Sequence, residues 1–278
     1  MPSADAFSPR SLGVVGLGRM AQALLSPLIA SGRLSPESIR AAVASHASAE
    51  RLSRELPLQV SNKADEAWRC PVVLLAVKPQ QLSTAAEACA SAPRKAAQGE
   101  PQPLLISVLA GVSLERLQQR FPGWICVRAV PNTPCLVRSG LSGLAWGEGL
   151  DAARRQWVIA LFAAVGEVLE LPESQLDAFL ALTSSGPAYV ALVAEAMADG
   201  AVTAGLPRAL AQHLAHRTLA GTAALLQEQK LHPGQLKDMV GSPAGTTMAG
   251  LRELERAALR SALIEAVLAA AQRSRELA

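Results

Sequence analysis

Residues 14–21, VVGLGRMA, carry the glycine spacing of a phosphate-binding loop. Gly16 permits a tight turn, Gly18 lets the backbone approach a pyrophosphate, and Ala21 allows a helix to pack closely on the preceding strand. The N-terminus of that helix would face the anion. Because the motif follows an apolar run and opens an amphipathic one, we interpret it as a dinucleotide site rather than a glycine turn. The expected cofactor contacts are Val15, Gly16, Leu17, Gly18, Arg19 and Met20.

The end of the second apolar run indicates which dinucleotide binds. NAD sites usually carry an acid at the tip of the second strand, where it binds the ribose hydroxyls. Residues 42–52 read AVASHASAERL, with no acid at the tip. This favours NADPH, with NADH left open as an alternative. Ser45, His46 and Ser48, with Arg51, are then candidates for the 2′-phosphate, and for each of them the reading as a solvated loop residue stays equally open.

A second cluster of small and hydroxyl residues, VGSPAGTTMAGL at 240–251, interrupts an alanine-rich region. Ser242 or Thr246 could cap a helix through its side chain. A helix that starts with small residues also leaves its first N–H groups free for an anion. Both readings stay open at this point.

The remaining reactive side chains give no metal site. Cys70, Cys89, Cys126 and Cys135 show no CxxC spacing, so we expect reduced, structural thiols. His213, His216 and His232 form no metal-like cluster, and we interpret them as structural.

Short apolar runs alternate with amphipathic segments up to about residue 170, which predicts βα units around a parallel sheet. The expected strands are 11–17, 38–44, 71–77, 103–109, 124–130, 140–146 and 167–171, and the expected helices are 19–31, 48–56, 79–90, 113–120 and 151–164. The Pro-rich segment 92–103 is expected to be a surface connection.

After Pro172 the strands stop and the chain is helical and rich in alanine. We therefore divide the chain into a loose tail (1–10), a dinucleotide-binding α/β domain (11–171) and an all-α domain (172–278). Apolar helices of this kind need more partners than one short domain offers, so we expect an obligate dimer.

Composition narrows the classes of partner. The net charge is only +3 and aromatic residues make up 3%, which argues against nucleic acid as a partner. The longest apolar runs are too short to cross a bilayer, and the N-terminus lacks the pattern of a signal peptide. A cytoplasmic protein is the default expectation.

Taken in order, several motifs resemble those of the pyrroline-5-carboxylate reductase family. They are VGLGRMA (15–21), LLAVKPQ (74–80), ISVLAGVSLERL (106–117), VRAVPNTP (127–134), SSGPAYV (184–190), EAMADGAVTAGLPR (195–208) and HPGQLKDMVGSPAGTT (232–247). The resemblance implies a Rossmann-like N-terminal domain, an all-helical dimerisation domain, and dimers that often assemble into rings. It also implies reduction of the cyclic imine 1-pyrroline-5-carboxylate to L-proline, the last step of proline biosynthesis.

The resemblance also implies roles for particular residues. Ala76, Val77, Lys78, Pro79 and Ala110 would contact the cofactor. Asn62 matches a nucleotide-contacting position, although its reading as a helix cap is the simpler one. Gly245, Thr246 and Thr247, with Ser242, would hold the substrate carboxylate.

Two further motifs are expected to shape the pocket. PNTP (131–134) would support the site from its edge, and Gly186-Pro187 would kink a helix beside the catalytic hydroxyls of Thr183 and Ser185. No candidate proton-donating pair stands on these motifs, which suits an imine that arrives already protonated.

Two departures from the family pattern leave alternatives open. Leu180 and Met239 stand where polar residues are usual. A reductase of a related cyclic imino acid, or a catalytically weakened NADP-binding relative, therefore stays in consideration.

Overall fold

The computed structural model describes residues 7–92 and 101–277. The chain divides into two compact units. Unit 1 comprises residues 1–184 together with 270–278, and unit 2 comprises residues 185–269. Most of the connection expected at 92–103, and part of the expected N-terminal tail, lie outside the described residues.

Unit 1 is built on one eight-stranded sheet of order β3-β2-β1-β4-β5-β6-β7-β8. In register, Leu12 of β1 lies opposite Ile39 of β2 and Val72 of β4. The strands are β1 (Leu12–Val15), β2 (Ile39–Ala42), β3 (Val60–Ser61), β4 (Val72–Leu75), β5 (Leu104–Ser107), β6 (Ile125–Val130), β7 (Gly140–Trp146) and β8 (Gly166–Glu170). All seven strands expected from the sequence are present.

The expectation of a wholly parallel sheet was wrong at the β6–β7 pair. β7 runs antiparallel to β6, and β8, which is parallel to β7, is therefore also reversed relative to β1–β6. A parallel pair needs a long crossover connection. Between β6 and β7 the chain has only PNTP and the 3-10 turn η3 (Thr133–Val137), so it reverses direction at once.

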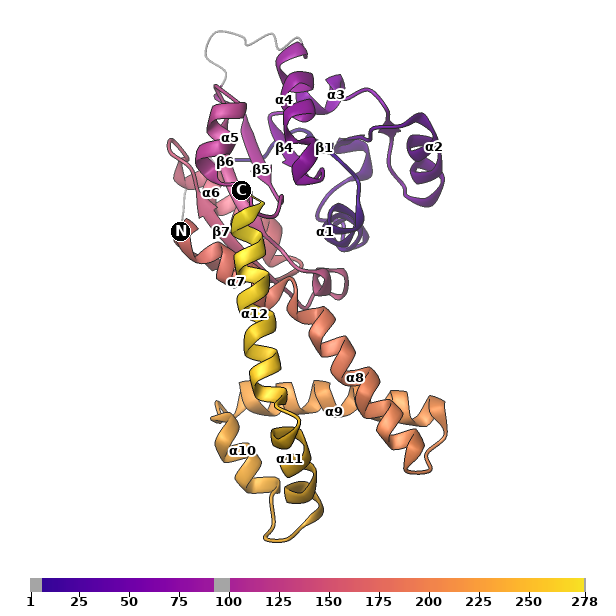
Figure 1. Cartoon of the computed structure of the whole chain (residues 1–278). Coiled ribbons are helices and arrows are strands. Elements are labelled where there is room, and N and C mark those ends of the chain that lie inside the picture. The colour runs from indigo at the N-terminus through magenta and orange to yellow at the C-terminus, as the bar shows by residue number, and fades with distance from the viewer. Residues whose placement is uncertain (1–6, 93–100, 278) are drawn as a thin grey trace. The chain divides into compact units, whose positions relative to one another are not determined.

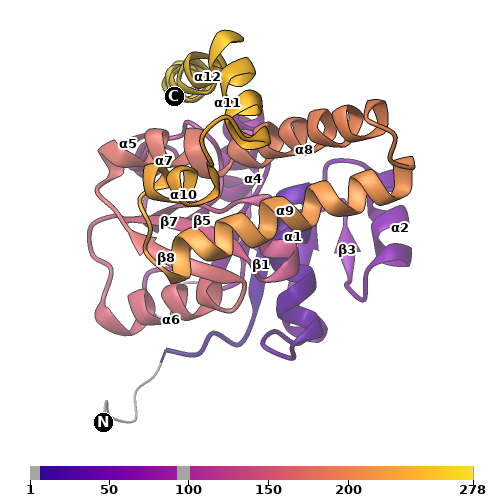
Figure 2. The same ribbon diagram turned by 90° about the horizontal axis from the view of Figure 1, so that it is seen from below.

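Helices cover both faces of this sheet, and Figure 2 shows α1 and α6 on one face with α4, α5 and α7 on the other. The helices are α1 (Arg19–Ala30), α2 (His46–Glu55), α3 (Asp65–Trp68), α4 (Leu82–Ser91), α5 (Leu114–Arg120), α6 (Ala152–Ala163) and α7 (Leu176–Thr183), with 3-10 turns η1 (Pro36–Ser38), η2 (Pro79–Gln81) and η4 (Glu173–Gln175).

Two hydrophobic cores follow from this layering, because alternate side chains of a strand point to opposite faces. Val72 and Leu74 of β4 join the core that contains Phe162, and Val73 and Leu75 join the core that contains Trp68. The strands that lead to the carboxyl edge of the sheet are therefore buried on both sides.

Unit 2 is entirely helical in the structure. It contains α8 (Gly186–Thr203), α9 (Arg208–Glu228), α10 (Pro233–Val240), α11 (Thr246–Arg256) and the first part of α12 (Leu259–Glu276), whose last turns belong to unit 1. The predicted fold class, a Rossmann-like α/β domain followed by an all-helical one, is confirmed.

The predicted kink at Gly186-Pro187 is instead a boundary between two helices. α7 ends at Thr183, and α8 begins at Gly186 with its proline in the first turn. Proline is well suited to that position because the N–H that it lacks has no partner in the first turn of a helix.

Candidate active site

A cavity of about 510 Å³ lies at the carboxyl edge of the sheet in unit 1. Open α/β sheets bind ligands at this edge. Of the predicted cofactor residues, eight line the cavity: Val15, Gly16, Leu17, Gly18, Asn62, Ala76, Val77 and Lys78. Ser48 and Arg51 line it as well. The other predicted cofactor residues are not among the lining residues: Arg19, Met20, Ser45, His46, Pro79 and Ala110. The cofactor-binding roles of all these residues, lining or not, stay predictions.

The two glycines of the phosphate loop are required for different reasons. Gly16 has φ +90°, and a Cβ there would lie 2.6 Å from the carbonyl oxygen of Ala76. A Cβ on Gly18 would meet nothing within 4 Å. Gly18 is also the N-cap of α1, and no described side chain caps that helix. The loop thus offers an open helix N-terminus to an anion, which fits a pyrophosphate.

Arg51 and Ser48 stand at the cavity end beside β2. Ser45 caps α2, accepting from the Ser48 N–H at 3.2 Å, and its hydroxyl donates to the Ser48 hydroxyl at 2.9 Å. The Arg51 guanidinium pairs with Glu55 at 2.8 Å. His46 lies 3.1 Å from Glu50 instead of lining the cavity. Arg51 is therefore the cation available to a 2′-phosphate here.

The opposite wall of the cavity follows β4. The Ala76 N–H donates to the Val15 carbonyl at 2.8 Å, which ties the two strand ends together. The Lys78 N–H donates to the Gln81 side chain at 3.2 Å, so the turn at Pro79 is fixed. The cap reading of Asn62 was wrong, because Ala64 is the N-cap of α3 and no side chain caps that helix.

Sequence reasoning missed several lining residues because most of them are small and apolar. On the α4 side, Gln81, Thr84, Ala85 and Ala88 line the cavity. Their spacing of three and four residues marks one face of a helix that starts just after Lys78, a signal that was available in the sequence. The others are Ala42, Val43, Ala44, Leu52 and Ala64.

The PNTP turn is fastened to the end of α7. The Asn132 amide donates to the Thr183 carbonyl at 2.9 Å and its oxygen accepts from the Leu141 N–H at 2.8 Å. The Ser184 hydroxyl donates to the Pro131 carbonyl at 3.0 Å. Thr183 itself is buried, and its hydroxyl donates to the Phe179 carbonyl at 2.7 Å. In this arrangement the Thr183 hydroxyl can only accept a hydrogen bond from a ligand.

In unit 2, the GTT segment begins α11. Gly245 is the N-cap, without a capping side chain, and its N–H donates to the Ser242 carbonyl at 2.9 Å. The side-chain capping considered for Ser242 and Thr246 is therefore not observed. Thr246 and Thr247 occupy the first helical positions, so the start of α11 is open to an anion. Ser185 occupies the N-cap position of α8, and its side chain makes no capping hydrogen bond either.

The two departures from the family pattern have different surroundings. Leu180 packs against the hydrophobic core that contains Trp68. Met239 on α10 is 67% exposed. Among residues 7–92 and 101–277, no three His, Cys, Asp or Glu side chains gather as a metal ion would require.

The fold and the phosphate loop define a Rossmann-type, dinucleotide-binding protein, and the family models place it among NADP-dependent oxidoreductases. Residues 11–111 match the family model described as NADP oxidoreductase, coenzyme F420-dependent. Residues 173–277 match the model for pyrroline-5-carboxylate reductase dimerisation.

Comparison with whole proteins gives the particular family. The chain is 46% identical to a pyrroline-5-carboxylate reductase of Synechocystis, with 96% of this chain and 97% of that protein covered. It is 40% identical to the Arabidopsis thaliana enzyme, with 96% and 95% covered. The chain belongs to the pyrroline-5-carboxylate reductase family.

Solved structures agree with this assignment. A Plasmodium falciparum pyrroline carboxylate reductase with NADP bound superposes with a TM-score of 0.85 at 27% identity, covering 96% of this chain and 97% of that one. The Coxiella burnetii pyrroline-5-carboxylate reductase gives a TM-score of 0.80 at 31% identity, with 97% and 98% covered.

Proposed function

We propose that this chain reduces the C=N bond of 1-pyrroline-5-carboxylate with NADPH to give L-proline. The observation that carries the proposal is the nucleotide cavity of unit 1, formed on a chain that matches the Synechocystis reductase over 96% of its length. Its cofactor is NADPH, with NADH as the alternative.

The described residues fit such a cofactor along the edge of the sheet. Ser48 and Arg51 would hold the 2′-phosphate, and the open start of α1 at Gly18 would hold the pyrophosphate. Beyond β4, Lys78 and then Ala110 would lie toward the nicotinamide, because the strand order places β5 next to β4. Bound NADPH supplies the hydride.

The imino acid needs a fixed anion site for its carboxylate. We assign this role to Gly245, Thr246 and Thr247 with Ser242, since α11 starts without a capping side chain and with two hydroxyl residues in its first turn. Thr183 and Ser185 would provide hydroxyls for the ring nitrogen. Holding the two reacting rings in contact supplies a large share of the rate enhancement, so no strong acid is required.

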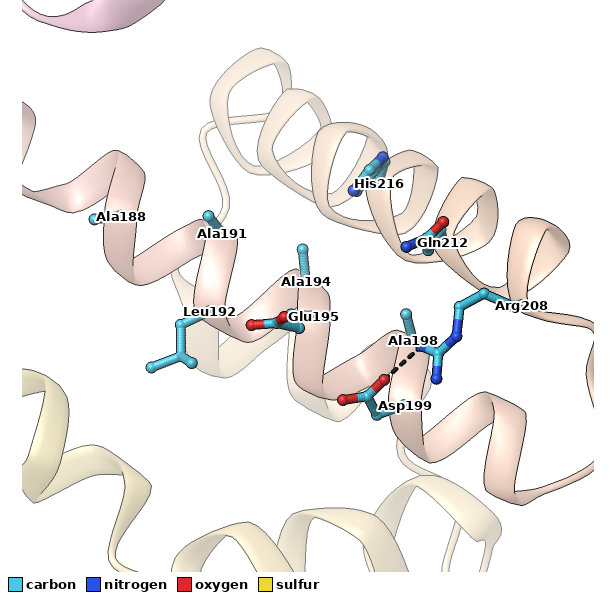
Figure 3. Close-up of a pocket in the computed structure, with 10 residues that line it drawn as sticks. All are labelled: Ala188, Ala191, Leu192, Ala194, Glu195, Ala198, Asp199, Arg208, Gln212 and His216. Atoms are coloured by element: carbon cyan, nitrogen blue, oxygen red, sulfur yellow. Dashed lines mark hydrogen bonds and ion pairs between the residues drawn. The ribbon is translucent and has the colours of Figure 1, made fainter.

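A homodimer is part of the proposal, with assembly of dimers into a ring as its extension. Support comes from the dimerisation model that matches residues 173–277 and from the groove of about 750 Å³ between α8 and α9. Figure 3 shows the groove: Ala194 and Ala198 lie on the side of α8 that faces Gln212 and His216 of α9, Leu192 points away from α9, and Arg208 pairs with Asp199. We place the domain boundary at residue 172, as the loss of strands indicates.

The helical stretch Glu173–Thr203 is long and apolar enough by composition to cross a membrane. It consists of α7 and α8, which belong mainly to different units and are separated by Ser184 and Ser185. We assign its apolar surface to packing between subunits and propose a cytoplasmic enzyme with no membrane or nucleic-acid partner.

NADPH oxidation tests the proposal. The purified chain is assayed with 1-pyrroline-5-carboxylate and with six-membered and sulfur-containing cyclic imino acids. The proposal predicts the highest kcat/KM with 1-pyrroline-5-carboxylate. A clear preference for another ring would identify a related reductase, to which the exposed Met239 would be relevant. NADPH binding without turnover of any imine would mean that catalysis has been lost.

A further inference from the structure

A buried arginine joins three separate elements of unit 1. Arg128 on β6 is 3% exposed, and its guanidinium pairs with Glu173 at 3.2 Å and Asp177 at 2.8 Å. Its Nε has no hydrogen-bond partner among the described residues. Burying such a group is costly unless its partners are well placed, so this cluster holds a defined geometry rather than simply adding stability.

Each of the two carboxylates holds another part of the chain. Glu173 accepts a hydrogen bond from the Leu114 N–H at 2.6 Å, at the first residue of α5. Asp177 accepts from the Ser274 hydroxyl at 2.8 Å, in the last turns of α12. Ser274 is 2% exposed. The arginine thus connects β6 to the start of α5 and to the end of α12.

The loop that follows β5, residues 108–113, ends at the first of these attachments, the Leu114 N–H. Gly111 in this loop has φ +72°, and a Cβ there would lie 2.5 Å from the Ser274 carbonyl oxygen and 2.8 Å from the Leu277 Cβ. The end of α12, the yellow helix in Figure 1, therefore lies directly against the loop. Only glycine allows this approach without strain.

The position of the loop gives the cluster its relevance to the reaction. It leaves the carboxyl end of β5, which neighbours β4 in the sheet. The residues just after β4, Ala76 to Lys78, line the nucleotide cavity. A dinucleotide with its pyrophosphate at β1 and its adenosine toward β2 extends its nicotinamide half past β4 toward this loop.

We propose that Arg128, Asp177 and Ser274 are positioning residues that hold the loop 108–113 where it supports the nicotinamide half of the cofactor. The last turns of α12 then support the cofactor site from outside the cavity lining. The inference rests on the proposed NADPH binding. It assigns a role to a buried network that lies outside the cavity lining.

The test separates the two halves of the cofactor. Ser274→Ala removes one hydroxyl, and Ser261→Ala, an exposed position on the same helix, is the matched control. NADPH binding is titrated by nicotinamide fluorescence, and 2′,5′-ADP, which lacks the nicotinamide, is titrated by calorimetry. We expect NADPH to bind about 10-fold more weakly in Ser274→Ala, the lower end of what one hydrogen bond to a charged group contributes, and 2′,5′-ADP to bind as in the parent.

Turnover gives a second readout. We expect kcat to fall and the deuterium isotope effect with 4-deuterated NADPH to change in Ser274→Ala, with the KM of the imino acid unchanged. Asp177→Asn keeps the volume of the side chain and should act in the same direction.

The inference is overturned if NADPH and 2′,5′-ADP weaken together, or if neither weakens while the melting temperature falls, because the network would then be structural only. Failure of the proposed reductase activity appears separately, as a parent protein that oxidises no NADPH while both titrations still report on binding.

Discussion

The two units differ most in what their apolar side chains contact. Unit 1 buries large side chains on both faces of its sheet, among them Trp68, Phe121 and Phe162. The buried hydrophobic cluster of unit 2 consists of Ala198, Ala211 and Ala215. Its large apolar residues lie on the surface instead: Val190, Leu192, Met197, Leu206, Leu210, Leu214, Leu225, Met239, Val240, Met248, Leu254, Leu263, Ile264 and Leu268.

This contrast shows that the apolar content of a unit does not tell whether its apolar side chains are buried within that unit. Alanine lets α8 and α9 approach closely, but the three buried alanines of unit 2 remove far less apolar surface from water than the many large side chains of unit 1. A surface with so many exposed apolar side chains marks a protein–protein contact. Unit 1 is complete as a core, whereas unit 2 leaves the apolar surface that the proposed dimer would cover.

The largest expected effect comes from placing a charge on the apolar surface of unit 2. Ile264→Glu should lower the molar mass in solution from that of two chains, twice 29.0 kDa, to the 29.0 kDa of one chain. A carboxylate buried at an interface without a partner costs at least about 3 kcal/mol. Size-exclusion chromatography with light scattering measures the molar mass of the parent and of the variant. Ala90→Glu, on an exposed face of α4 in unit 1, is the control. A dimer that persists in Ile264→Glu places the interface elsewhere.

Next in size are the two glycines of unit 1, which separate folding from binding. Gly16→Ala should destabilise the fold by about 1–3 kcal/mol, because φ is +90° and the new Cβ meets the Ala76 backbone. Gly18→Ala should leave the melting temperature within a few degrees of the parent but weaken NADPH, because its Cβ occupies the open side of the loop. Thermal unfolding and NADPH titration distinguish them. Equal destabilisation by both substitutions would contradict the assignment.

A smaller effect is expected at the adenosine end. Arg51→Gln should weaken NADPH about 10- to 30-fold, the size of one charge-assisted hydrogen bond to a phosphate, and leave NADH almost unchanged. Glu55→Gln should strengthen NADPH slightly, since it removes the carboxylate that pairs with Arg51 at 2.8 Å. Titration with both cofactors at two salt concentrations measures this preference. Equal weakening of NADH would mean that Arg51 does not contact the 2′-phosphate.

The smallest expected effect lies in unit 2. Thr247→Ala should raise the KM of the imino acid about 10-fold, the lower end of what one hydrogen bond to a charged group contributes. The binding of NADPH should not change, because its proposed site is in unit 1. Steady-state kinetics with the imino acid and NADPH varied in turn measures the KM of each. Weaker NADPH binding with an unchanged KM is the opposite pattern and would remove Thr247 from the carboxylate site.

The strands were predictable because buried parallel strands read as continuous apolar runs. β3 and α3 were missed, since two and four residues are too short to show a period. The direction of β7 was missed because composition carries no sign of strand direction. That direction depends on the short connection through PNTP and η3.

The phosphate loop could be predicted because each glycine has a steric task. The alanines that line the rest of the cavity, such as Ala85 and Ala88, carry no chemical signal of their own. The network around Arg128 was beyond sequence reasoning, because Glu173, Asp177 and Ser274 are brought to it only by the fold. Helix ends were also misjudged, since Gly245 rather than a hydroxyl residue caps α11.

Unit 1 begins near the first residue of the chain and includes its last described turn. Domains usually fold in order as the ribosome releases them. Here the segment that supports the loop after β5 is synthesised only after all of unit 2. The nucleotide-binding unit therefore cannot acquire this element before unit 2 has been made, and the maturation of the two units is linked in time.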